Sequence, residues 1–258
     1  MNLSRISAII LRHFFLILHQ IERSADVFLF PILGLVLWGF LTTYAQAFSQ
    51  TFAGFFIGAM ILWVVYERVS TSIGIDFMYD VWERNLVNVL ATGITTFEYI
   101  LGLVGVAFIK VIISFLAMWA LAAIFFNFSI GNLGLPLVAF WVNLVIFAVA
   151  LGIFNVSIVM RWGNTIGPLT WVIPFVIQPF SAVFYPVSVL PPVLQKVAGI
   201  LPISYVFEGM RYTIKTSKFD GQQFFIALGL NAFYLTAVII FFAFMFNLVK
   251  KKGSLTKL

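Results

Sequence analysis

Few residues of this chain have side chains that could act in catalysis or bind a metal. Their spacing argues against metal binding, nucleotide binding and covalent catalysis. The two histidines, His13 and His19, are six residues apart, which places them on different faces of a helix. The sequence has no cysteine, no G-x-x-x-x-G-K-[ST] phosphate loop, no H-E-x-x-H zinc motif and no G-x-S-x-G nucleophile turn. We therefore expect no catalytic residue, no metal site and no cofactor held by this chain.

The polar residues that remain gather in one internal segment, residues 76–102, which holds four of the nine acids. Its apolar residues recur at spacings of three and four, which predicts a helix with one apolar face. The polar face would carry Asp80, Glu83, Arg84, Asn85 and Asn88. Such a helix can lie flat on a membrane and present its polar side to a partner in water. The alternative is a solvated helix that only joins two membrane spans.

The composition indicates what must position this segment. Of the 258 residues, 62% are hydrophobic and 9% are charged, whereas a soluble domain carries about 25% charged residues. The fold class expected is therefore an all-α integral membrane protein. The net charge is +6, but the basic residues do not cluster with aromatic residues on a soluble domain, so we expect no nucleic-acid binding.

Hydropathy and proline positions predict six transmembrane helices in a single domain, residues 1–258. An interfacial helix at 4–23 would precede them, and a partly inserted external hairpin of two short helices at 187–216 would separate the last two. With both termini inside, ten Lys and Arg residues lie inside and four outside, as the positive-inside rule requires. The expected spans lie at about 27–44, 51–69, 103–126, 136–160, 168–186 and 222–249.

Polar residues inside these spans are candidates for a substrate path. Lys110 lies about two turns inside the third span, where it could snorkel, make a local contact or meet a substrate. Asn143, Asn155 and Ser157 on the fourth span could line a path or hydrogen-bond between helices. Because the spans carry little fixed charge, we expect a lipid-like or amphiphilic cargo rather than a small ion.

Two stretches resemble the type-2 ABC transporter permeases. The first, WERNLVNVLATGITTFEYILG at 82–102, resembles the coupling helix by which these permeases dock on their ATPase. Glu83, Arg84, Leu90, Glu98 and Gly102 match, whereas Asn85, Asn88 and Gly93 stand where glycine, an acid and proline are common. The resemblance implies that the ATPase contacts are Asp80, Glu83, Arg84, Asn85, Leu86, Asn88, Leu90 and Glu98.

The second stretch, residues 178–211, resembles the external re-entrant hairpin of the same family. The match is carried by Pro186, Leu190, Pro191, Pro202, Glu208, Gly209 and Arg211. Glu208 and Arg211 are three apart on a helix and could form a structural pair, or they could gate the outer exit.

The resemblance implies the permease subunit of an ATP-driven exporter in a bacterial or archaeal cytoplasmic membrane. Two copies, expected as a homodimer in contact with membrane lipid, would pair with two P-loop ATPase subunits that hold ATP and magnesium. The cargo would be lipid-like, amphiphilic or a glycan. The alternative function is an ion-coupled secondary transporter, which would want an acid inside the membrane. An integral-membrane enzyme is a third class, but the acids lack a recognisable catalytic spacing.

Overall fold

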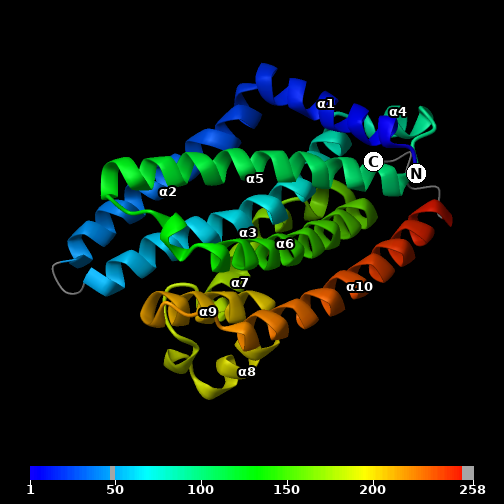
Figure 1. The fold of residues 1–258 in the computed structure, drawn as a ribbon. Helices are drawn as coiled ribbons and strands as arrows, with labels where there is room; N and C mark the ends of the chain where they lie inside the picture. Colours follow the sequence, from blue (N-terminus) through cyan, green and yellow to red (C-terminus); the bar gives the residue numbers. More distant parts are fainter. Residues whose placement is uncertain (47–49, 252–258) are drawn as a thin grey trace.

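The computed structural model of the chain describes residues 1–46 and 50–251, and within these ranges it has helices and no strands. Five of the described helices are long and apolar enough to cross a membrane, and they form one bundle (Figure 1). These are α2 (Ile21–Gln46), α3 (Gln50–Trp82), α5 (Thr96–Phe126), α6 (Leu135–Trp162) and α10 (Gly221–Lys251). The chain is therefore a multi-pass membrane protein, as its composition predicts.

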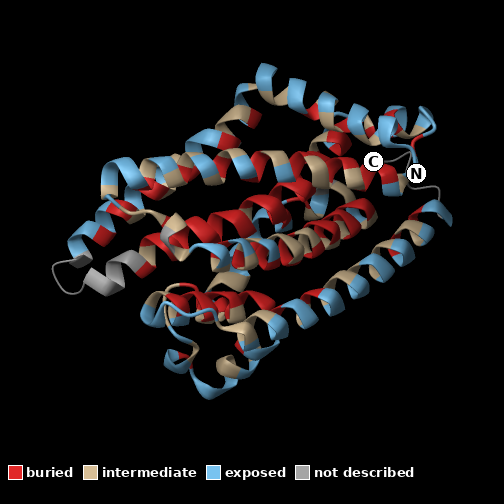
Figure 2. Ribbon diagram, viewed as in Figure 1, coloured by how far each residue is buried: buried red, intermediate tan, exposed pale blue. Residues whose placement is uncertain are grey.

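Helix α3 is the centre of the bundle. It packs against α2, α5 and α6, and it is buried along most of its length (Figure 2). By contrast, α10 packs on α6 and exposes its outer side. Asn231 of α10 connects α10 to α6. Its side-chain amide donates to the backbone carbonyl and the side-chain oxygen of Asn143 at 3.0 and 2.9 Å.

The extent of α3 differs from the expected second span at 51–69. The helix continues to Trp82 and carries Glu67, Arg68, Asp76 and Asp80 within it. A charge inside a span is tolerated when it is paired, and the partners are present. Glu67 lies 3.3 Å from Arg68, while Asp76 and Asp80 meet cationic side chains of other helices. Glu67 and Arg68, which lie at the end of the expected span, therefore lie inside a longer helix.

Residues 76–102 do not form one amphipathic helix, which corrects that expectation. After Trp82 the chain turns at Arg84, whose φ of 54° is left-handed, and then forms the short helix α4 (Leu86–Ala91). A second turn includes Gly93 with φ of 81°. Helix α5 starts after Thr95, which forms a capping box with Glu98.

The first helix, α1 (Leu3–His19), ends earlier than the predicted 4–23, because Gln20 is extended and α2 begins at Ile21. Helix α1 packs across α5. Two glycines of α5 allow this close approach, since a Cβ on either one would come within 2.6 Å of an isoleucine side chain of α1. Gly102 faces Ile9 and Gly105 faces Ile10.

The expected fifth span, 168–186, is not a single long helix. It consists of α7 (Leu169–Ile177), with Pro174 inside, and the 3₁₀ turn η3 (Gln178–Ser181). The turn η2 (Gly163–Ile166) connects it to α6. This segment runs antiparallel to α3, because Thr170 packs on Gly74 and Phe184 stacks on Phe56. Those two points are 18 residues apart on α3, or about 27 Å at the helical rise.

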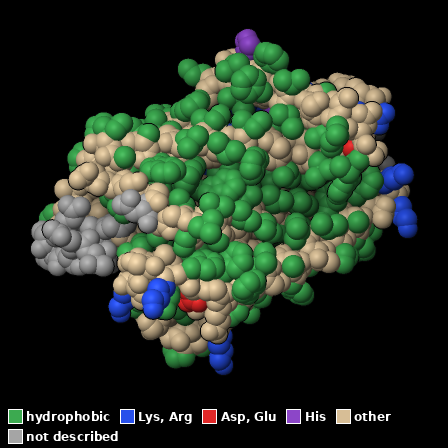
Figure 3. Space-filling view, viewed as in Figure 1, with side chains coloured by type: hydrophobic (Ala, Val, Ile, Leu, Met, Phe, Trp, Pro, Cys, Tyr) green, Lys and Arg blue, Asp and Glu red, His purple; other side chains and the backbone are tan. Residues whose placement is uncertain are grey.

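The termini of the helices define two ends of the bundle. The α4 end holds α4, the start of α1 and the end of α10, and the hairpin end holds α8 (Pro192–Ile200) and α9 (Pro202–Thr216) (Figure 1). The turns η1 (Ile130–Leu133) and η4 (Val187–Val189) complete the described elements. Figure 3 shows Lys and Arg gathered at the two ends and hydrophobic side chains over the face between them.

Candidate functional site

The surface that α4 presents at its end of the bundle is small and mixed in character. Leu86 and Val89 are buried beneath the helix, and Ile94 is buried in the turn that follows. The outward side carries exposed Arg84, Asn88 and their neighbours. Of the predicted ATPase contacts, Glu83, Arg84 and Asn88 are exposed, Asn85 and Leu90 are half-buried, and Asp80, Leu86 and Glu98 are buried.

Asp80 does not face water, which corrects its expected place on a polar helix face. Because α3 is unbroken to Trp82, Asp80 points toward α1 and α5 and is fully buried. Both its carboxylate oxygens accept from the Arg12 guanidinium, one of them at 2.9 Å, and the Tyr99 hydroxyl donates to it at 2.5 Å. The hydrogen bonds from Arg12 to Asp80 raise the pKa of Arg12 above its usual value. Asp80 therefore links α3 to α1 and α5.

Glu98 is also turned inward, where it fixes the start of the chain. Its carboxylate accepts from the backbone N–H groups of Thr95 at 3.0 Å and Asn2 at 2.7 Å. Arg5 lies 3.6 Å from the same carboxylate and donates to the Gly93 carbonyl at 2.7 Å. The beginning of α1 is thereby attached to the turn that follows α4.

A matching attachment lies on the other side of α4. The Arg23 guanidinium, near the start of α2, donates to Glu83 at 2.9 Å and stacks over the Tyr79 ring at 4.3 Å. Arg5 and Arg23 thus hold the two turns that flank α4. The spacing of Arg5, Arg12 and Arg23 would place them on one face of a helix over residues 4–23, but nothing in the sequence indicates their acidic partners.

Lys110 makes a local contact, one of the alternatives that the sequence left open. Its ammonium group donates to both oxygens of Asp76 at 2.9 and 2.8 Å, and both side chains are buried. The Ser72 hydroxyl donates to Asp76 at 3.1 Å. Sequence reasoning missed Asp76 as the partner, because the two residues lie 34 positions apart.

His13 is buried between the two aspartates of α3. Its Nδ1 lies 3.9 Å from Asp76 and its Nε2 lies 3.8 Å from Asp80, and neither nitrogen has a hydrogen-bond partner among the described residues. Burial lowers the pKa of His13, against the opposing effect of the two aspartates. The imidazole is therefore held neutral next to Arg12 and Lys110.

At the hairpin end, Glu208 and Arg211 form the pair that their spacing predicts. The Arg211 guanidinium lies 2.9 Å from Glu208, and Glu208 accepts from the Val187 N–H at 2.7 Å. Arg211 also donates to the carbonyl of Ala182 and, at 3.0 Å, to that of Val183. Burial lowers the pKa of Arg211. The pair therefore fixes α9 to the segment that follows η3.

The other hairpin residues have structural positions. Pro186 precedes η4, Pro191 precedes α8, and Pro202 occupies the first turn of α9, where a missing N–H is tolerated. Gly209 packs against Phe140 of α6, and a Cβ there would lie 3.1 Å from that ring. These residues set where each short helix begins and how closely α9 approaches α6.

The three substrate-path candidates of α6 are buried. Asn143 bonds to Asn231 of α10, and the Ser157 hydroxyl donates to the Ile153 carbonyl at 2.7 Å within its own helix. Asn155 packs beside Gly74 of α3. Asn143 thus takes the alternative role, a hydrogen bond between helices, whereas Ser157 bonds only within α6.

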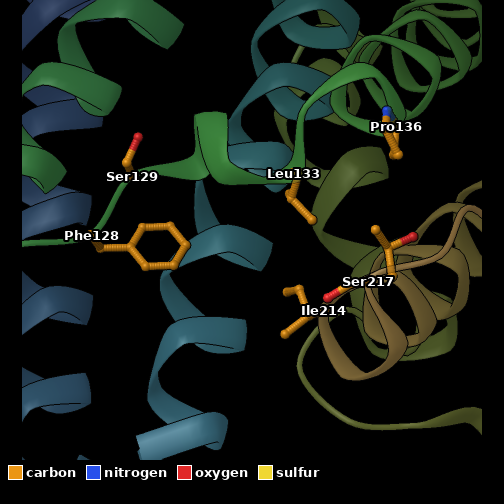
Figure 4. Close-up of a pocket in the computed structure, with 7 residues that line it drawn as sticks. Phe128, Ser129, Leu133, Pro136, Ile214 and Ser217 are labelled. Carbon is orange, nitrogen blue, oxygen red and sulfur yellow. The ribbon is translucent and has the colours of Figure 1, made fainter.

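An open cavity of about 380 Å³ lies at the hairpin end, between the connection after α5 and the end of α9 (Figure 4). In Figure 4, Phe128 and Ser129 lie across the cavity from Ile214 and Ser217. Leu133, Pro136 and Thr213 complete its lining. The cavity therefore offers hydroxyl groups and apolar surface, and none of its described lining residues is charged.

The comparisons with known proteins agree with this architecture. No curated protein matches the chain. A family model described as "ABC-2 type transporter" matches residues 6–215, which is well over half of the chain and includes α1, α4 and the hairpin. The chain therefore belongs to the ABC-2 type transporter family, whose membrane subunits are transport permeases that work with a separate ATPase subunit.

Proposed function

We propose that the protein is the permease subunit of an ATP-driven exporter, moving a lipid-like, amphiphilic or glycan substrate outward across a bacterial or archaeal cytoplasmic membrane. ATP and magnesium would be bound by the partner ATPase. Membership in the family favours this function over ion-coupled secondary transport. The acids that an ion-coupled transporter would want do lie within α3, but Asp76 and Asp80 are engaged by Lys110 and Arg12.

The observation that carries the proposal is the attachment of α4. An ATPase that pushes on this short helix can transmit force only if the helix is firmly joined to the spans. Arg5 joins the turn after α4 to α1, and Arg23 joins the turn before α4 to α2. Exposed Arg84 and Asn88 are then the groups that meet the ATPase, with Glu83 beside them. Asp80 and Glu98 would support this surface from beneath rather than touch the partner.

The arrangement of the helices also supports the expected assembly. If the α7 and η3 segment crosses beside α3, the chain makes six crossings, and the N-terminus and the end of α10 lie on the same side. With α4 facing the cytoplasm, both would be cytoplasmic. Helices α2 and α7 expose large apolar side chains, among them Leu37, Phe40, Val172 and Phe175. A second copy of the permease or membrane lipid would cover them, as expected of a dimer with two ATPase subunits.

The substrate route and the outer gate belong to the same proposal. A cavity of about 390 Å³ between α2, α3 and α7 is lined by aromatic side chains and by the Glu67 and Arg68 pair. It offers a better candidate path than the buried residues of α6. At the hairpin end, Glu208 and Arg211 hold α9 to backbone groups of residues 182, 183 and 187, so release of these backbone contacts would free the hairpin to move as a gate.

The test is a charge reversal at α4. Arg84→Glu should weaken co-purification of the permease with its ATPase by about ten-fold or more, because like charges placed against a partner's acidic groups cost several kcal/mol. Arg161→Glu is the matched control, since Arg161 lies in the last turn of α6, outside α4. Equal association of both variants would contradict docking at α4. If the wild-type chain recruited no ATPase at all, the ATP-driven function itself would be wrong.

A further inference from the structure

Two neighbouring cavities share one side chain, Trp171 of α7. The first, of about 200 Å³, lies toward the α4 end, and we call it the polar cavity because four of its seven described lining residues are charged. The second is the aromatic cavity of about 390 Å³ described above. Together they follow α3 from Tyr79 to Met60, which is 19 residues or about 28 Å along the helix. One leaflet of a bilayer is about 20 to 22 Å thick with its headgroups, so the two cavities can hold one lipid lengthwise.

Arg23 lines the polar cavity, and one edge of its buried guanidinium has no hydrogen-bond acceptor among the described residues. Arg23 is only 2% exposed, and its Nη2 donates to Glu83. Its Nε and Nη1 have no hydrogen-bond partner among the described residues, and Nη1 lies 3.9 Å from Asp76. Buried N–H groups of a charged side chain are rarely left without an acceptor. The polar cavity therefore fits a ligand that brings oxygen acceptors, such as a phosphate group.

The charges around this cavity indicate which phosphate. Its described lining carries two cations, Arg23 and Lys110, and two anions, Glu22 and Asp76. A purely anionic headgroup would leave its charge uncompensated there, whereas a zwitterion would not. Glu22 is exposed and can receive an ammonium group. The ring of Trp171, which is partly exposed, also lines the cavity and can stack on a cation.

The second cavity suits an acyl chain. It is lined by Pro31, Met60, Trp63, Val64 and Phe175, and its ionic groups, Glu67 and Arg68, lie 3.3 Å from each other. Its outer border is apolar and open, because Trp171 is 41% exposed and Phe175 is 53% exposed. A chain can therefore enter sideways from the surrounding bilayer.

We propose that α2, α3 and α7 form a binding site for one zwitterionic phospholipid of the leaflet at the α4 end. The phosphate oxygens lie on the free edge of Arg23, the ammonium group lies at Glu22, and an acyl chain passes Trp171 into the aromatic cavity. This site requires only that the chain sits in a membrane, so it does not depend on the proposed coupling to an ATPase.

The test is native mass spectrometry of the delipidated full-length protein, titrated separately with phosphatidylethanolamine, phosphatidylglycerol, glycerophosphoethanolamine and inorganic phosphate. Phosphatidylethanolamine should bind as a single adduct, about ten-fold tighter than phosphatidylglycerol. The two chainless compounds should not be retained, because they lack the apolar contribution. Equal or tighter binding of phosphatidylglycerol would overturn the zwitterion assignment, and retention of free phosphate would overturn the lipid as the source.

Two variants localise the adduct. Trp171→Ala removes the side chain shared by both cavities, and Arg23→Lys keeps the charge but removes the free guanidinium edge. Each should weaken phosphatidylethanolamine binding by about ten-fold. Trp162→Ala is the matched control, since Trp162 is a half-exposed tryptophan at the end of α6. If Arg23→Lys failed to fold, Trp171→Ala would decide alone. Unchanged binding in Trp171→Ala, or an equal loss in the control, would refute the site.

Discussion

The two ends of the bundle fix their short helices in different ways. At the α4 end, ionic contacts join segments that are distant in the chain, and one of them, Lys110 with Asp76, is fully buried. These contacts are Arg12 with Asp80, Lys110 with Asp76, and Arg23 with Glu83. At the hairpin end, the ionic pair lies within one helix, α9, and its outward hydrogen bonds go to backbone groups of residues 182, 183 and 187, while the Arg211 guanidinium also lies over the Phe55 ring of α3.

This difference indicates which end of the molecule is rigid and which end can open. Removing one partner of a buried interhelical pair leaves an uncompensated charge in the core. Separating Glu208 and Arg211 from the backbone leaves them still paired with each other, so the cost is a few hydrogen bonds. The α4 end is thus suited to transmit movement, and the hairpin end is suited to undergo it.

The largest expected effect comes from breaking the Asp76 and Lys110 pair. Asp76→Asn leaves a buried ammonium group without its counter-charge, and we expect about 3–5 kcal/mol of lost stability. Thermal unfolding of the purified protein in detergent measures it. Asp220→Asn is the control, because Asp220 caps the start of α10 away from the cluster, and asparagine caps equally well.

The double variant Asp76→Asn with Lys110→Met sharpens this prediction. It removes both charges, so most of the lost stability should return. If the double variant were as unstable as Asp76→Asn alone, the loss would come from packing around Asp76, and the α4 end would not owe its rigidity to charge pairing.

A smaller effect is expected at the hairpin end. Arg211→Gln removes the donors to the carbonyls of Ala182 and Val183, and hydrogen bonds from a charged group contribute about 1.5–3 kcal/mol. Because the bundle does not depend on them, the loss should appear as faster proteolysis of residues 182–201, with little change in the melting of the bundle. Lys215→Gln, an exposed change on the same helix, is the control. A drop in melting temperature as large as that of Asp76→Asn would erase the distinction between the ends.

The sequence predicted the hairpin end better than the α4 end. The hairpin end depends on local sequence signals, whereas the α4 end depends on contacts between residues that are far apart in the sequence. Prolines at 191 and 202 mark helix starts through local chemistry, and two short helices occur within residues 187–216. At the α4 end the partners lie 34 to 68 residues apart. Four charges in α3 lowered its hydropathy and suggested a span that stopped early, because nothing in a single sequence shows that Arg12 and Lys110 pair with two of them, Asp80 and Asp76.

The local signals at the α4 end were readable only in part. The sequence TTFE at 95–98 is a capping box and marks the start of α5, whereas the left-handed residue before α4 is Arg84 and not a glycine or the neighbouring Asn85. Likewise, the prolines of residues 168–186 favour a bent segment, but they do not indicate the left-handed Ala182 that ends η3.

The smallest expected effect concerns pH at the α4 end. Burial lowers the pKa of His13 below its ordinary value of 6.5, although Asp76 and Asp80 oppose that shift while Arg12 on the same helix and Lys110 on α5 reinforce it. The unfolded chain therefore binds a proton more readily than the folded one, so stability is full above pH 6.5 and is lost as the pH falls below it. About one pH unit below 6.5 the loss of stability is no more than about 1.4 kcal/mol.

His13→Gln should remove this pH dependence, while His19→Gln, at the exposed end of α1, should keep it. Melting temperatures of the three proteins across this range measure the difference. An acid sensitivity that survives His13→Gln would assign it to the aspartates, and the α4 end would then be held by their ionisation alone.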